Sequence, residues 1–293
     1  MVLSNPDNCI TPRAGLQLVA KLDKLLDIAG TIDASSPSIK KRRRGLSLGS
    51  LILSVSETML SGGDFLCDLD FQRYDKAGLA LRAVPDVPAS TTVISLGKRF
   101  DSKVAAGLEV ANKKLIGAAF NLLNDSRKNK LVLTRPTIDM DPTDVEVYGS
   151  KKEGVAYNYQ GQRCYRPHLV VWAEAGVVLT GELGSGKDSP CPQAPSLIKK
   201  AVDNLPPGLL RPIVRCDSGF FSKSVAEAAL ENNADFAIAA KRNKAAWHSM
   251  RQIGDDGWKE AIDMHAEVAE CGYVPSLWPV GTRTGLSESM WKL

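Results

Sequence analysis

The spacing of hydrophobic residues changes once along the chain. From about Gly15 to Leu123, apolar positions recur every three or four residues, as in GLQLVAKLDKLLDIAG and LSLGSLILSVSETML, which is the spacing of one face of an α-helix. This pattern predicts a small all-helical domain. Its later part has short helical runs separated by Pro and Gly, with Ser90 or Thr91 placed as the N-cap of a helix that carries Lys98 and Arg99. That arrangement fits a helix-turn-helix, and it fits a plain helical packing domain at least as well.

After the polar stretch NDSRKNK, the pattern becomes that of β-strands. The runs LVLTRPTIDMD, DVEVYG, RPHLVVWAEAG and VVLTGEL are separated by Gly-containing turns, and a helix (PSLIKKAVDNL), a strand (PIVRCDSGF), a helix (SKSVAEAALENN) and a strand (DFAIAAKRN) follow. This order, β-β-β-α-β-α-β, is that of a ribonuclease H-like mixed sheet. The expected fold class is therefore α/β (α+β), a ribonuclease H-like core preceded by the all-helical N-terminal domain.

These changes in pattern set the expected domain boundaries. We expect a helical N-terminal region over residues 1–130, the mixed-sheet core over 131–245 and a further segment over 246–293. The last segment is predicted to begin an inserted, β-rich part of the fold.

The composition is that of an ordinary globular protein. Hydrophobic residues make up 44% and charged residues 24% of the 293 positions, which is enough apolar material for one or two cores. No run reaches the roughly 18 apolar residues that span a bilayer, and the N-terminus lacks the order of a signal peptide. A cytoplasmic protein without a membrane partner is the expectation. Six cysteines form no C-x-x-C pair, so we expect free thiols.

Positive charge is concentrated at one place. The net charge of +4 does not by itself separate a DNA-binding protein from any other enzyme. The dense cluster directly follows the segment DASSPS and consists of Lys40, Lys41, Arg42, Arg43 and Arg44. Adjacent cations suit a phosphate backbone because each contact releases condensed counterions, and a solvated loop is the alternative.

Two aspartates follow apolar strands and are the main candidates for chemistry. Asp141 ends the first predicted core strand and Asp217 ends the fourth; in a ribonuclease H-like sheet these strands are neighbours. Two close carboxylates repel each other and favour a hard divalent cation, Mg²⁺ or Mn²⁺, which would support in-line phosphoryl transfer. Asp139 lies on the same strand face as Asp141 and is the alternative ligand. Taken singly, each aspartate also fits a turn or helix cap.

Several motifs in order resemble one known family. These are the D-x-D-x-T strand, the Tyr148-Gly149 strand end, the RPH tripeptide, the Gly184-Ser185-Gly186 turn and the C-D-S-G-F strand end. The stretch from about Thr137 to Asn243 resembles the catalytic domain of bacterial DDE transposases of the insertion sequence 1380 group, with weaker similarity in the helical part.

The resemblance implies that Asp141 and Asp217 are the first two members of an acidic triad that binds Mg²⁺. The third member is expected to be a glutamate on a later helix, and Glu260, Glu267 and Glu270 are not assigned to it because their segment looks like the start of the inserted part. The tail GLSESMWKL departs from the expected basic strand. We therefore expect a C-terminally truncated copy that lacks the third carboxylate.

The resemblance also implies the partners. These are double-stranded DNA, both the terminal inverted repeats and the target, and further copies of the chain on the DNA. The helical region 1–130 would then serve DNA binding and oligomerisation. The alternatives are a non-catalytic DNA-binding remnant that regulates transposition and, ranked last, a ribonuclease H-like nuclease.

Other polar residues have two readings each. Arg166 and His168 would touch a phosphate or be a strand-entry arginine and a hydrogen-bonded histidine. Lys241 and Arg242 would lie near a DNA groove or form a solvated basic pair. Lys187 follows GSG, but this turn lacks the glycine spacing and the Ser or Thr of a nucleotide-binding loop, so nucleotide binding is excluded there.

Overall fold

The computed structural model describes residues 10–40, 45–149, 151–241, 243–260, 262 and 267–287. The chain divides into two compact units, Met1–Asn124 and Asp125–Leu293. The expected border at residue 130 therefore falls inside a helix of the second unit. None of the described helices has both the length and the apolar character needed to span a bilayer.

The first unit is built from helices in the part that the structure describes. They are α1 (Leu16–Leu26), α2 (Ile28–Ser35), α3 (Leu48–Leu60), α4 (Asp68–Arg73), α5 (Lys76–Leu79), α6 (Ser90–Gly97) and α7 (Ser102–Leu122). A core cluster that includes Ile32, Ile39, Leu51 and Val104 packs α2, α3, α6 and α7 together.

The start of α6 differs from the expectation. Its N-cap is Ala89, which makes no side-chain cap hydrogen bond. Ser90 instead donates from its backbone N–H and its hydroxyl to the two carboxylate oxygens of Asp70. The cap prediction for Ser90 or Thr91 is thus wrong, because a carboxylate from α4 satisfies the first turn of this helix. Lys98 is the C-cap of α6, and Arg99 follows it outside the helix.

The second unit contains a mixed sheet. Its strands are β1 (Thr137–Pro142), β2 (Val145–Glu146), β3 (Ala156–Tyr157), β4 (Arg163–Trp172), β5 (Val177–Ser185), β6 (Ile213–Cys216) and β7 (Asp235–Ile238). β1 is central: it pairs antiparallel with β4 and parallel with β6, β4 pairs with β5, and β6 pairs parallel with β7. The short β2 and β3 both pair with β4.

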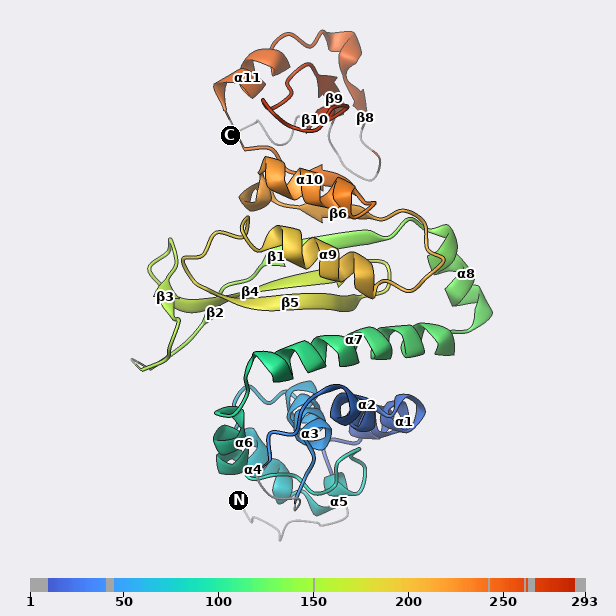
Figure 1. The fold of residues 1–293 in the computed structure, drawn as a ribbon, viewed down its shortest axis with the longest axis vertical. Coiled ribbons are helices and arrows are strands. Elements are labelled where there is room, and N and C mark those ends of the chain that lie inside the picture. The colour runs from blue at the N-terminus through green and yellow to red at the C-terminus, as the bar shows by residue number, and fades with distance from the viewer. Residues whose placement is uncertain are drawn as a thin grey trace, which may run out of the picture. The chain divides into compact units, whose positions relative to one another are not determined.

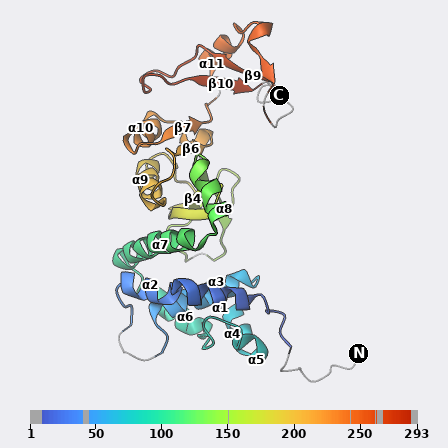
Figure 2. The same cartoon turned by 90° about the vertical axis from the view of Figure 1, so that its right-hand side faces the viewer.

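Two helices cover one face of this sheet. α9 (Ala194–Asn204) packs on β4 and β5, and α10 (Lys223–Glu231) packs on β7 and on α9, as the two views show (Figures 1 and 2). Side chains buried in this layer include Met140, Trp172 and Val214. The predicted succession of strands and helices from Thr137 to Ile238 is confirmed, except that the short strand β3 was not predicted.

The prediction was wrong at the start of this unit. Leu131–Leu133 belong to α8 (Asp125–Leu133) instead of the first strand. Pro136 disfavours helical backbone at the residue before it, and the strand begins directly after it at Thr137. An apolar triplet read alone does not distinguish the end of a helix from the start of a strand.

The remaining described elements form a small second sheet. α11 (Lys244–Met250) precedes β8 (Lys259–Glu260), β9 (Glu267–Cys271) and β10 (Thr284–Ser287), which pair in the order β10-β9-β8. Residues 285–287, expected to belong to an aberrant tail, are thus part of a strand. The short 3-10 helices are η1 (Ser218–Phe220) and η2 (Asp255–Gly257). Free thiols are confirmed for the five cysteines in the described ranges.

Candidate active site

The parallel pairing of β1 with β6 brings two carboxylates to neighbouring strand ends. Met140 and Cys216 are register partners. Asp141 and Asp217 each come one position later in the sequence. Neighbouring strands lie about 4.8 Å apart, so the two aspartates start from adjacent points of the sheet.

Both aspartates belong to the face of the sheet opposite the buried layer. Side chains alternate between the two faces of a strand, and Ile138, Met140 and Val214 are buried while Asp141 is exposed. Asp217 keeps an extended backbone, with φ −74° and ψ −179°, and is also exposed. Water and ions therefore have access to both carboxylates.

Asp139 is already neutralised by a cation. Its carboxylate oxygens accept hydrogen bonds of 2.6 and 2.7 Å from Nε and Nη2 of Arg215, its register partner on β6. Two parallel bonds of this kind are the strongest form of the arginine–carboxylate pair, and they raise the pKa of Arg215 above its usual value. The carboxylate of Asp141, in contrast, has no hydrogen-bond or ion-pair partner in the described part of the chain.

Asp217 also has a local structural role. One of its oxygens accepts a hydrogen bond of 2.9 Å from the backbone N–H of Gly219 and so caps η1. A carboxylate has about four lone-pair sites, so this bond leaves capacity for a further ligand. The cap holds the side chain at the end of β6, next to the strand that carries Asp141.

The donor set fits part of a magnesium or manganese site. Both ions prefer oxygen ligands, and Mg²⁺ keeps several waters while binding one or two carboxylates. Within the described residues there is no group of three or more acidic, His or Cys side chains that could hold a metal. Glu260, Glu267 and Glu270 lie on β8 and β9 of the small sheet, where Glu270 pairs with Arg283.

Arg166 forms an ion pair with Asp144, which was not among the candidate residues predicted from the sequence. Its Nε and Nη2 donate to the carboxylate of Asp144 over 2.7 and 3.1 Å, and its Nη1 donates to the backbone oxygen of Asp188 over 3.2 Å. The hydrogen bond from Arg166 lowers the pKa of Asp144. The guanidinium is therefore engaged within the protein. Asp144 is only three residues after Asp141, and a D-x-x-D pattern is too common to mark it.

His168 lies on the buried face of β4. The side chain is 2% exposed, and neither ring nitrogen has a hydrogen-bond partner in the described structure. Burial, with the nearby charge of Arg166 second, lowers its pKa. The reading as a hydrogen-bonded histidine is therefore wrong, and burial on this face keeps the ring away from the side that carries Asp141.

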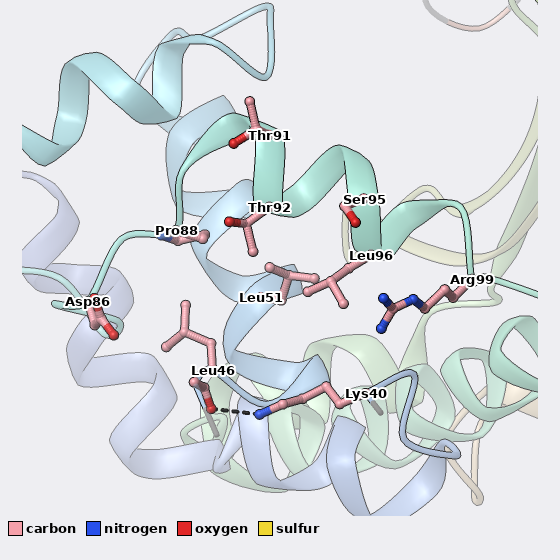
Figure 3. A pocket seen from close by; sticks show the side chains of 11 residues that line it. Lys40, Leu46, Leu51, Asp86, Pro88, Thr91, Thr92, Ser95, Leu96 and Arg99 are labelled. Atoms are coloured by element: carbon pink, nitrogen blue, oxygen red, sulfur yellow. Dashed lines mark hydrogen bonds between the residues drawn. The ribbon is translucent and has the colours of Figure 1, made fainter. Parts of the chain in front are cut away.

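The basic residues named from the sequence are spread over both units. Lys40 and Arg99 line a cavity in the first unit (Figure 3), and Lys98 is exposed beside it. Lys241 lines a cavity of about 450 Å³ between β7 and the small sheet, together with Arg215 and Trp278. The remaining members, Lys41, Arg42, Arg43, Arg44 and Arg242, lie outside the described residues.

Comparison with known proteins gives the family. The family model described as transposase DDE domain group 1 matches residues 3–285, so the chain belongs to this family. Among solved structures, a chain of the cryo-EM structure of a piggyBac transposase synaptic complex with hairpin DNA matches with a TM-score of 0.42 and 12% identity. The match covers 92% of this chain and 60% of that one, so the chain spans less than two thirds of the length of that transposase. No curated protein matches.

Proposed function

We propose that this chain is the part of a DNA transposase that carries the first two metal-binding carboxylates, Asp141 and Asp217. The reaction class is metal-dependent cleavage of DNA and strand transfer at the ends of an insertion sequence. The single observation that carries the proposal is the pair of exposed carboxylates one position beyond the register pair Met140 and Cys216. The subgroup is proposed to be that of insertion sequence 1380.

The order of the strands supports a ribonuclease H-like core. Read across the sheet, β5, β4, β1, β6 and β7 follow one another, which places the first and fourth core strands side by side. Both aspartates therefore lie at the same end of the sheet, although most of the core sequence separates them along the chain. A mixed sheet of this order places the two carboxylates where one metal site could use both.

Each residue of the proposed site has a separate role. Asp141 and Asp217 would hold Mg²⁺ or Mn²⁺, and metal bound there would supply charge stabilisation for the attacking and leaving oxygens of phosphoryl transfer. Arg215 would keep Asp139 neutralised, so that excess negative charge is confined to the ligand pair. The Gly219 N–H would orient the Asp217 carboxylate.

The third acidic ligand is proposed to lie outside the described residues. Glu260, Glu267 and Glu270 belong to a separate small sheet, and Glu270 is engaged with Arg283. With two carboxylates the chain would bind metal and DNA but would not cleave efficiently by itself, because phosphoryl transfer needs ions fixed in place. A role as a DNA-end binder that competes with the complete enzyme is the second proposal, and it is favoured by the absence of a three-ligand acidic cluster among the described residues.

The partners are proposed by unit. The helical unit would bind terminal inverted repeats, and the sheet unit would contact the DNA backbone, with further copies of the chain on paired ends. Phosphate contacts would position the protein, while a few base contacts would specify the ends.

Calorimetric titration with Mn²⁺ tests the metal site. Asp141→Asn and Asp217→Asn should each lower the affinity by about tenfold or more, because each removes one charged ligand of a hard cation. The control is Asp203→Asn, which removes an equal charge on α9, where Asp203 pairs with Lys199 on the same exposed helix face. Wild-type affinity in both site variants would rule out this pair as the metal site.

A further inference from the structure

We infer that the cavity between Lys40 and Arg99 in the first unit is a phosphate seat for the DNA backbone. The inference rests on the proposed function, because it names where the helical unit contacts DNA. The cavity has a volume of about 680 Å³ and is bordered by α6, by the start of α3 and by the loop before α6 (Figure 3).

Two cations line this cavity, and each is positioned by a single backbone oxygen. Lys40 Nζ donates to the oxygen of Gly45 over 2.7 Å, and Arg99 Nη1 donates to the oxygen of Ile39 over 3.3 Å. An ammonium has three donors and a guanidinium has five, so most of their donors remain for a ligand. In the described structure, neither cation has an acidic partner within ion-pair distance. Two unneutralised cations in one cavity repel each other, and an anion between them removes this cost.

Residues of the packed core form one wall of the cavity. Leu51 and Leu96 line it and also pack in the core of the unit. Ile39, whose oxygen holds Arg99, is 7% exposed and belongs to the same core. Arg99 is therefore attached through Ile39 to the packed part of the unit, and Lys40 directly follows Ile39 in the chain, which lowers the entropy lost on binding.

The helix α6 adds neutral donors on its outer side. Val93 and Leu96 of α6 pack on the core, while Thr92 and Ser95 are exposed and line the cavity. Hydroxyl groups, like arginine and lysine, are common donors to phosphate oxygens in protein–DNA contacts. The combination of two cations and nearby hydroxyls suits a phosphodiester.

One carboxylate marks the far end of the cavity. In Figure 3, Asp86 enters from the end opposite Arg99. Its charge repels a phosphate and so favours the seat at the cationic end. The contact would be sequence-independent, since a phosphate carries no base identity. The seat therefore contributes affinity and salt dependence, and specificity must come from other contacts.

The chain offers a matched control for the test. Lys98 and Arg99 are adjacent and both exposed, but only Arg99 lines the cavity. The position of Lys98 at the C-cap of α6 is explained by the negative end of the helix dipole. Lys98→Gln and Arg99→Gln thus remove equal charge from neighbouring positions with different surroundings.

The experiment measures binding of a fluorescent DNA duplex of arbitrary sequence by anisotropy, in EDTA, across a range of NaCl concentrations. One lost phosphate contact reduces the slope of log K against log salt by about 0.9, which is about an eightfold loss of affinity at 0.1 M salt. We expect this loss for Arg99→Gln and for Lys40→Gln, a much smaller effect for Lys98→Gln, and tighter binding for Asp86→Asn. Arg99→Lys should retain most of the slope because it keeps the charge.

The outcomes separate the inference from the function on which it rests. Equal losses in the Lys98 and Arg99 variants, or wild-type binding by Arg99→Gln, would overturn the phosphate seat while DNA binding stands. Absence of duplex binding by the wild-type chain would overturn the proposed DNA role as well. Thermal unfolding of each variant, followed by circular dichroism, shows whether a loss of binding comes from a loss of fold.

Discussion

The ion pair between Asp144 and Arg166 shows how a single residue can make stability depend on pH. Hydrogen bonds from Arg166 lower the pKa of Asp144 in the folded protein, whereas an unfolded aspartate titrates near about 3.9. The unfolded chain therefore binds the proton more readily. The stabilisation is present above the unfolded pKa and is lost as the pH falls through the folded one.

We predict that Asp144→Asn removes part of the acid sensitivity of the second unit. At neutral pH the variant should lose about 1 kcal/mol of unfolding free energy, since the pair is partly shielded from solvent. Between about pH 5 and pH 3 its stability should fall less steeply than that of the wild type. Urea denaturation at each pH measures this, with Asp203→Asn as the exposed control. Parallel pH curves for wild type and Asp144→Asn would contradict the assignment.

Single residues were predictable from the sequence where they interrupt a pattern. Asp141 and Asp217 follow apolar strands, and this made them visible. Glu57 and Arg82 were not identified from the sequence. They form an ion pair of 3.0 Å inside the first unit, with side chains 0% and 1% exposed. A hydrophobic pattern treats charged positions as surface, because the partner that allows burial comes from another helix.

At the scale of elements, the turn after β5 depends on a glycine for packing. A Cβ at Gly186 would lie 2.5 Å from Sγ of Cys164 and 2.7 Å from the backbone oxygen of Ala156. The Gly-Ser-Gly sequence before Lys187 thus permits close approach of three chain segments. This gives the turn a structural reason that has nothing to do with phosphate binding.

Gly186→Ala should therefore destabilise the second unit by about 1–3 kcal/mol, the usual cost of overpacking. Gly117→Ala is the control, because Gly117 lies in α7 with no atom within 4 Å of its added Cβ. That change should stabilise the helix by about 0.5–1 kcal/mol. Chemical denaturation measures both, and a neutral Gly186→Ala would show that the turn can relax.

The order of elements was largely predictable, and their ends were not. The two-residue alternation of apolar positions predicted β4 and β5, and their three-to-four-residue spacing predicted α9 and α10, because each of these elements has one buried face. The helical state of Leu131–Leu133 was missed because three apolar residues satisfy either pattern. The capping of α6 by Asp70 was missed because it joins segments distant in sequence.

At the scale of the whole molecule, the two proposed sites lie in different compact units. Asp217→Asn should leave the affinity for duplex DNA in EDTA within about twofold of wild type, and Arg99→Gln should leave the Mn²⁺ affinity unchanged. Sites without shared partners are usually additive. The same two titrations, each run on both variants, check this, and a loss in both assays for either variant would indicate coupling.

Tryptophan provides a separate optical signal for the second unit. All five tryptophans of the chain, Trp172, Trp247, Trp258, Trp278 and Trp291, come after residue 124. Tryptophan emission therefore reports unfolding of the sheet unit directly, while circular dichroism reports both units. The difference between the two curves gives the stability of the helical unit.

The pairing of β1 with β6 also matters during protein synthesis. Asp139 and Arg215, which face each other across these strands, are 76 positions apart in sequence. Until a ribosome has translated β6, β1 can pair with β4 but not with β6, so Asp139 lacks Arg215 and Asp141 lacks the neighbouring Asp217. A nascent chain therefore lacks the pair of neighbouring carboxylates, which forms only after β6 has emerged and paired with β1.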